Sequence, residues 1–96
     1  MFDQQKQATM IRLLEALFPG VKIYLFGSRA WGPERPAADI DLALDIGRKL
    51  TIVEIAQARN VLDTFPIGQK IDVVDMWSIP DQLKNKILQQ GIVWKN

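Results

Sequence analysis

The sequence contains neither cysteine nor histidine. Without cysteine there is no disulfide framework and no thiolate-ligated zinc site. Without histidine, Ser-His and Cys-His catalysis and most transition-metal sites are excluded as well. Any catalysis must therefore run through carboxylates and a hard metal ion such as Mg²⁺, which takes oxygen ligands.

The sequence also lacks an excess of positive or negative charge, and it lacks long apolar runs. The formal net charge of the 96 residues is +1, so nothing in the balance predicts nucleic acid as a direct partner. No apolar run approaches the ~18 residues of a membrane span, and the first residues, MFDQQKQAT, do not resemble a signal peptide. We expect a cytoplasmic protein with no membrane partner, folded as a single domain over residues 1–96.

Hydrophobic periodicity and turn residues divide the chain into alternating helices and strands. The predicted helices cover 4–18, 51–64 and 78–91. A helical turn is predicted at 29–31, with Ser28 near its N-cap and Gly32 closing it. The predicted strands cover 21–26, 39–46 and 69–75, and 92–94 forms a short strand or a tail. Prolines and glycines predict a loop at 32–38 and a break at 65–68. The order α-β-β-α-β-α(-β) predicts an α/β (α+β) fold, a small mixed sheet with helices packed on it.

Local signals refine two of these helices. Thr51 and Glu54 have the spacing of a capping box at the start of the middle helix. The apolar stripe predicted for that helix contains Ile52, Ile55, Ala56, Arg59 and Leu62. The stripe predicted for the last helix contains Leu83, Ile87 and Leu88, with Pro80 early in the helix and Gly91 as its cap.

The segment IYLFGSRAWGPERPAADIDLAL, residues 23–44, organises the rest of the chain. Asp39 and Asp41 are two residues apart on a predicted strand, so they project from one face while Ile40 and Leu42 enter the core from the other. Adjacent carboxylates repel each other unless a cation lies between them. Mg²⁺ fits because it accepts carboxylate oxygens, keeps several waters and completes its shell with substrate phosphates.

A phosphate site and a third carboxylate are predicted close to this pair. Gly27 and Ser28 supply backbone N–H groups and a hydroxyl at a turn, which suits an anion. Asp72 lies on the third strand between two apolar residues, so it faces away from the core. If that strand pairs beside 39–44, all three carboxylates converge and can hold two divalent ions about 3.5–4 Å apart.

Several of these residues have simpler interpretations that the sequence leaves open. Asp39, Asp41 and Asp72 can belong to a solvated strand face, and Gly27-Ser28 can be an ordinary turn at the end of a strand. Asp45 and Asp75 compete for the role of third carboxylate; Asp45 lies some 7 Å beyond Asp41 by strand rise, and Asp75 has the wrong parity.

The cations Arg29, Lys22 and Arg35 can contact phosphate or remain surface charges. Trp31 is a candidate for adenine stacking or partner contact, and Trp77 and Trp94 for interface anchors or core residues.

Gly27-Ser28 followed by Asp39-Ile40-Asp41 resembles the signature of the DNA-polymerase-β-like nucleotidyltransferases. Within that superfamily the chain is most similar to the minimal nucleotidyltransferase (MNT) family, and the resemblance covers nearly its whole length. It implies that Gly27 and Ser28, with Arg29 beside them, bind nucleotide phosphates. It also implies that Asp39, Asp41 and Asp72 are the catalytic carboxylates and ligands of two Mg²⁺ ions. Trp31 and Ala38 depart from the residues that relatives often carry there, which affects loop geometry and nucleotide preference but removes no ligand.

The resemblance also implies a partner. MNT proteins are often encoded beside HEPN-type proteins, and the pair resembles a toxin–antitoxin module in which AMP from ATP is transferred to a tyrosine of the HEPN toxin. We therefore expect a nucleotide triphosphate substrate and a hetero-oligomer with a HEPN-type toxin, which would supply the acceptor surface that this short chain has little room for. Two alternatives remain: an antitoxin that silences its partner by occlusion without catalysis, and a nucleotidyltransferase acting on a small molecule such as an antibiotic.

Overall fold

The computed structural model describes residues 4–32, 39–64 and 70–96. Within these ranges the chain alternates between helices and strands in the predicted order. The elements are α1 (Gln4–Leu17), β1 (Lys22–Phe26), α2 (Ser28–Trp31), β2 (Ile40–Asp45), α3 (Ile52–Asp63), β3 (Ile71–Asp75), α4 (Asp81–Gln90) and β4 (Ile92–Lys95). The predicted break at 65–68 and all of the predicted loop after Gly32 lie outside the described residues. The segment at 92–94, which the sequence left as strand or tail, belongs to a strand.

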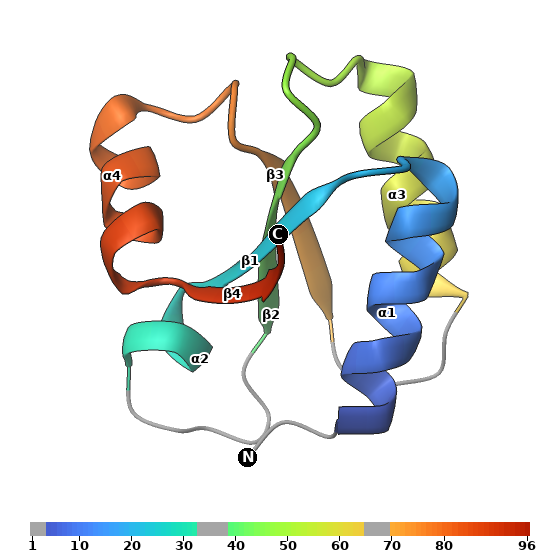
Figure 1. Cartoon of the computed structure of the whole chain (residues 1–96), viewed down its shortest axis with the longest axis horizontal. Coiled ribbons are helices and arrows are strands. Elements are labelled where there is room, and N and C mark those ends of the chain that lie inside the picture. The colour runs from blue at the N-terminus through green and yellow to red at the C-terminus, as the bar shows by residue number, and fades with distance from the viewer. Residues whose placement is uncertain (1–3, 33–38, 65–69) are drawn as a thin grey trace.

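The four strands form one mixed sheet in the order β3-β2-β1-β4. β1 is antiparallel to both β2 and β4, whereas β2 and β3 are parallel. Parallel neighbours need a crossover connection, and α3 provides it. Figure 1 shows α1 and α3 on one side of the sheet and α2 and α4 on the other. The expectation of a small mixed sheet with helices packed on it is confirmed.

The two faces of the sheet bury two separate apolar clusters. The larger cluster joins α1 and α3 to the sheet and contains Ile40, Leu42 and Leu44 of β2. The smaller cluster lies on the opposite face and includes Ala43 together with residues of β1 and α4. The alternation predicted for β2 is thus confirmed, because its isoleucine and leucines enter the larger core while Asp41 and Asp45 face the other way.

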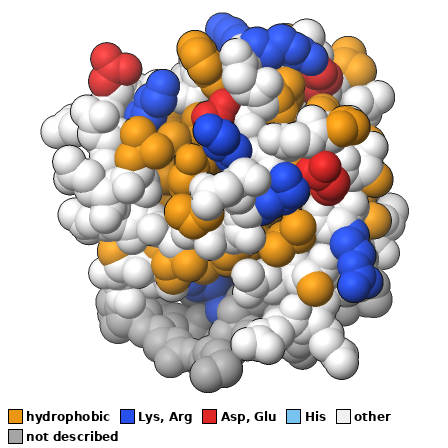
Figure 2. All heavy atoms as spheres, in the orientation of Figure 1, with side chains coloured by type: hydrophobic (Ala, Val, Ile, Leu, Met, Phe, Trp, Pro, Cys, Tyr) orange, Lys and Arg blue, Asp and Glu red, His pale blue; other side chains and the backbone are white. Residues whose placement is uncertain are grey.

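Three apolar residues predicted to lie in helical stripes, Ile52, Ala56 and Leu88, are exposed instead. Ile52 is 89% exposed, because α3 packs through Ala58 and Leu62, and Ile52 lies about 60° beyond Ile55 around the helix, on the side away from Ala58. Leu88 is 53% exposed, since the α4 face that packs on the sheet is centred on Ile87. Figure 2 shows apolar side chains reaching the surface in the region of α4 and β4.

The ends of α4 follow the local signals with one shift. Pro80 is the N-cap of α4 rather than a residue within it, and Gly91 caps the other end as predicted. None of the helices in the described ranges combines the length and the apolar character that crossing a membrane requires.

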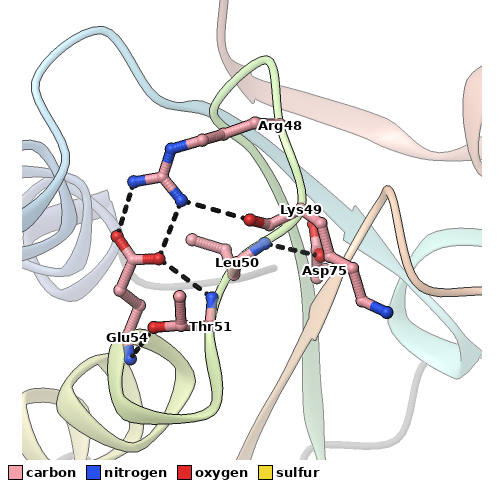
Figure 3. A network of polar contacts seen from close by, with 6 residues as sticks. All are labelled: Arg48, Lys49, Leu50, Thr51, Glu54 and Asp75. Atoms are coloured by element: carbon pink, nitrogen blue, oxygen red, sulfur yellow. Dashed lines mark hydrogen bonds and ion pairs between the residues drawn. The ribbon is translucent and has the colours of Figure 1, made fainter.

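The start of α3 is held by a capping box and an ion pair (Figure 3). The Thr51 hydroxyl accepts a hydrogen bond from the Glu54 N–H at 3.1 Å, and the Glu54 carboxylate accepts one from the Thr51 N–H at 2.9 Å. Arg48 donates two more hydrogen bonds to Glu54 at 2.9 and 2.8 Å. These bonds, with that of Arg48 the strongest, lower the pKa of Glu54 to about 2. The predicted capping box is therefore confirmed and reinforced.

Asp75 connects the end of β3 to the start of α3. Its carboxylate is buried and accepts hydrogen bonds from the Leu50 N–H at 2.9 Å, the Ser78 hydroxyl at 2.8 Å and the Trp77 N–H at 3.0 Å. Figure 3 shows the bond to Leu50, which brings the chain before α3 against the end of β3. Asp75 is a structural residue, consistent with the parity that made it a poor candidate for catalysis.

Replacing Asp75 with alanine is expected to lower the free energy of unfolding by about 2–3 kcal/mol, because buried donors lose a charged acceptor. Replacing the exposed Asp63 with alanine is expected to change it by no more than about 0.5 kcal/mol. Urea unfolding followed by circular dichroism measures both variants. Equal losses for the two would contradict the structural role of Asp75.

Candidate functional site

Asp41 and Asp72 are partners in the register of the parallel β2–β3 ladder. Neighbouring strands lie about 4.8 Å apart, so the two carboxylates lie side by side, on the sheet face that carries α2 and α4. Asp39 comes one residue before β2, is exposed to solvent and has the same parity as Asp41. β3 therefore pairs beside β2, the condition on which the predicted convergence of Asp39, Asp41 and Asp72 depended. Asp41 and Asp72 lie next to each other, and Asp39 lies at the near end of the strand.

The charges of these carboxylates act on one another. Partial burial raises the pKa of Asp41, and the negative charges of Asp72 and Asp39 raise it further. The positive charge of Lys70, just before β3, opposes the rise. Asp41 is thus the centre of an acidic group in which a cation would relieve the repulsion.

The turn after β1 brings a glycine against Asp41. Phe26 is the register partner of Asp41, and Gly27 follows it with φ 77° and ψ −156°, a conformation that is essentially restricted to glycine. A Cβ atom at Gly27 would overlap the Asp41 carboxylate. Both the backbone conformation and the contact therefore require glycine here.

The helix α2 starts directly at this turn. The Gly27 carbonyl accepts hydrogen bonds from the N–H groups of Ala30 at 2.9 Å and Trp31 at 3.1 Å. Gly27, not Ser28, is the N-cap, and no side chain caps the helix, so the predicted capping role of Ser28 is wrong. The Ser28 hydroxyl is consequently not used as a cap. Gly32 closes the helix as predicted.

The donor set fits magnesium. All three acidic residues offer carboxylate oxygens, the ligands that Mg²⁺ prefers, and their repulsion is of the kind that a divalent cation removes. Among the residues in the described ranges, no group of three or more acidic side chains is placed so that it could hold a metal ion, so the predicted convergence of all three carboxylates is not seen. Asp41 and Asp72 form the adjacent pair, and Asp39 borders the segment that the structure does not describe.

The family model described as "Polymerase beta, Nucleotidyltransferase" matches residues 9–95. The chain belongs to this nucleotidyltransferase family. The match spans α1 to β4 and includes every residue of the candidate site.

Solved structures of toxin–antitoxin complexes are similar to this nucleotidyltransferase. One chain of a toxin–antitoxin crystal structure with AMP-PNP shares 27% sequence identity with this chain, and the two superpose with a TM-score of 0.77. The match covers 92% of this chain and 71% of the other. A complex of tri-AMPylated Shewanella oneidensis HEPN toxin with MNT antitoxin is 26% identical with a TM-score of 0.74, covering 95% and 70%. The fold is that of the MNT antitoxins of HEPN toxin–antitoxin pairs.

A curated relative gives a similar result. The "Putative protein adenylyltransferase" of Methanocaldococcus jannaschii is 26% identical over 68 residues, which is 71% of this chain and 72% of the relative. The resemblance to MNT proteins stated from the sequence is thereby confirmed, and this nucleotidyltransferase spans rather more than two thirds of the length of its relatives.

Arg59 is a residue near the site of this nucleotidyltransferase whose role sequence reasoning missed. It was assigned to the apolar stripe of α3, but its guanidinium lies 3.6 Å from the Asp72 carboxylate and donates to the Val73 carbonyl at 3.3 Å. The Val73 N–H also donates to the same Asp72 oxygen at 3.1 Å. The sequence did hold a signal for this contact, because Arg59 is a charged residue within an apolar stripe. It also lies on the helix that precedes the strand of Asp72.

Asp45, a competing candidate for the third carboxylate, is engaged elsewhere. It accepts hydrogen bonds from the Trp77 indole N–H and the Gly47 N–H, both at 2.8 Å. Burial raises the pKa of Asp45, but these two bonds together with the charges of Lys22 and Lys84 outweigh it and lower the pKa. The Asp45 carboxylate therefore stabilises the turn at the end of β2 and does not join Asp41.

The tryptophans differ in their surroundings. The ring of Trp31 lies 6.2 Å from that of Phe26 between centroids, and the Lys86 ammonium lies 4.4 Å from its centre, so its part in adenine stacking stays a prediction. Trp77 is half exposed, with Lys84 over its ring, and Trp94 packs against the larger core.

Replacing Gly27 with alanine is expected to lower the free energy of unfolding by about 1–3 kcal/mol through backbone strain, with a further cost from the overlap with Asp41. Gly47→Ala is the matched control, because Gly47 also has positive φ but open space around it; about 1 kcal/mol is expected. Adding Asp41→Ala to Gly27→Ala should recover part of the loss. Urea unfolding of these three variants and the wild type measures this, and equal losses at Gly27 and Gly47 would contradict the contact.

Proposed function

We propose that this nucleotidyltransferase moves AMP from ATP to a hydroxyl group, that of a tyrosine, on a HEPN-type partner and thereby acts as its antitoxin. The observation that carries the proposal is the register pairing of Asp41 with Asp72, beside the Gly27 turn. The likeness to a complex that contains a tri-AMPylated HEPN toxin supports the choice of substrate and acceptor.

Each side chain has a distinct part in this reaction. Asp39, Asp41 and Asp72 would hold two Mg²⁺ ions, which when bound neutralise triphosphate charge and activate the attacking hydroxyl. The N–H groups and hydroxyl at Gly27-Ser28 would bind the phosphates, with Arg29 contributing positive charge. Asp72 would accept the hydroxyl proton as general base.

The covalent step is a displacement at the α-phosphorus of ATP. The acceptor oxygen bonds to that phosphorus, the bond to the bridging oxygen breaks, and pyrophosphate leaves. The proton of the acceptor hydroxyl passes to the Asp72 carboxylate. A HEPN-type partner that presents the hydroxyl forms a hetero-oligomer with this chain, as expected from the resemblance.

Incubating the protein with α-labelled ATP, Mg²⁺ and the HEPN-type protein encoded beside it is expected to label the partner. Asp41→Asn should lower the labelling rate at least about a hundredfold, because the site loses the charge at its centre. Asp45→Asn is the matched control on the same strand and face, since an amide oxygen can still accept from Trp77 and Gly47. Omitting Mg²⁺ should abolish labelling.

The contrary outcomes separate the alternatives. Equal labelling by wild type and Asp41→Asn would refute the carboxylate mechanism. Silencing of the partner that survives Asp39→Ala with Asp41→Ala, in the absence of label, would show an antitoxin that acts by occlusion. Label on a small molecule and none on the partner would show a small-molecule transferase.

A further inference from the structure

A groove runs along α3 and opens next to Asp72. A hollow of about 400 Å³ at the start of β3 is lined by Asp72, Lys70, Arg59 and Asp63. A second hollow of about 570 Å³ lies beside the first half of α3, and Arg59 and Asp63 line both. The two hollows therefore adjoin along Arg59 and Asp63, and together we call them the α3 groove.

The sheet order places this groove on the side from which an acceptor must come. β2, with Asp41, lies between β1, which ends at the Gly27 turn, and β3, which carries Asp72. In an in-line displacement the attacking and leaving oxygens are on opposite sides of the phosphorus. With the leaving phosphates at the Gly27 turn, the acceptor approaches over β3, where the α3 groove opens.

The two ends of the groove differ in chemistry. The end at Asp72 carries two cations, Arg59 and Lys70, and Lys49 adds a third at the other hollow. Once Asp72 serves as a metal ligand, Asp63 is the acidic residue left to balance them among the described lining residues, so the groove favours an acidic segment. The far end is apolar, with Ile55 and the 89% exposed Ile52.

The apolar end is also preformed. Ile52 is the first residue of α3, directly after the capping box of Thr51 and Glu54. The preceding residue, Leu50, is hydrogen-bonded to Asp75 (Figure 3). An exposed isoleucine on a backbone that is fixed in this way loses little conformational freedom when a partner covers it.

We propose that the α3 groove binds the acceptor segment of the partner protein. The hydroxyl-bearing residue lies at Asp72, an acidic side chain faces Arg59 and Lys70, and an apolar side chain packs on Ile52 and Ile55. Each hollow is within the volume range of protein pockets that hold a few side chains or a small ligand. This inference rests on the proposed transfer to a protein hydroxyl and specifies how that protein is recognised.

The test measures initial labelling rates against the concentration of the HEPN-type partner. Ile52→Asp is expected to raise the KM for the partner about tenfold, since an apolar contact is replaced by a charge. The KM for ATP and the kcat at saturating partner should not change. Val53→Asp is the matched control, because Val53 is 65% exposed on the next residue but does not line the groove.

Charge is tested separately with Lys49→Glu, which is expected to raise the KM for the partner about fivefold, because a cation of the groove is replaced by a negative charge that repels the acidic segment. An unchanged KM would contradict the acidic character of the segment. Lys22→Glu is its control, because Lys22 lies on β1 and does not line the groove, and it should leave that KM unchanged. Circular dichroism and urea unfolding confirm that all four variants fold.

A photo-crosslinking amino acid at position 52 or 53 separates this inference from the proposed function. Crosslinking of the purified partner from 52 but not from 53 supports the groove even if no AMP is transferred. Labelling by the wild type with an unchanged partner KM for Ile52→Asp, and equal crosslinking from both positions, would overturn the groove and leave the transfer reaction standing.

Discussion

Asp41 and Asp72 lie beside each other because β2 and β3 are hydrogen-bonded in parallel, with Leu42 opposite Val73 on the core side. The apolar partners of this ladder are buried against α1 and α3, which fixes the register through packing on one face. A shift by one residue would place the carboxylates in the core. The apolar face therefore holds together a pair of like charges that would otherwise separate, and a cation bound at the pair would relieve the remaining repulsion.

Period-two alternation was sufficient to assign the faces of β2 and β3, and the capping box was sufficient to place the start of α3. The position of Asp72 beside Asp41 depended on a pairing that no local pattern encodes, and only its parity was predictable. The exposure of Ile52 and the contact of Arg59 with Asp72 escaped prediction because they depend on how α3 is rotated against the sheet. The N-cap was assigned to Ser28 by its residue type, whereas the contact with Asp41 and the positive φ select Gly27 for that position.

Opposite faces of one sheet thus have different tasks. The α1/α3 face supplies most of the buried apolar volume, and the α2/α4 face carries the acidic group and the glycine turn. Asp75 connects the two regions, because its buried carboxylate hydrogen-bonds the chain at the start of α3 to the end of β3. β3 pairs with the strand of Asp41, and the start of α3 lines the α3 groove. The match to the polymerase beta nucleotidyltransferase family, over residues 9–95, includes residues of both faces.

The central claim is that Asp41 and Asp72 share a divalent cation. Crystals of the protein soaked with Mn²⁺ and a non-hydrolysable ATP analogue test it through the anomalous scattering of manganese. We predict a peak between the two carboxylates at coordination distances of about 2.0–2.2 Å, with the nucleotide phosphates toward the Gly27 turn. Manganese bound only elsewhere, with nucleotide present and this pair unoccupied, would contradict it.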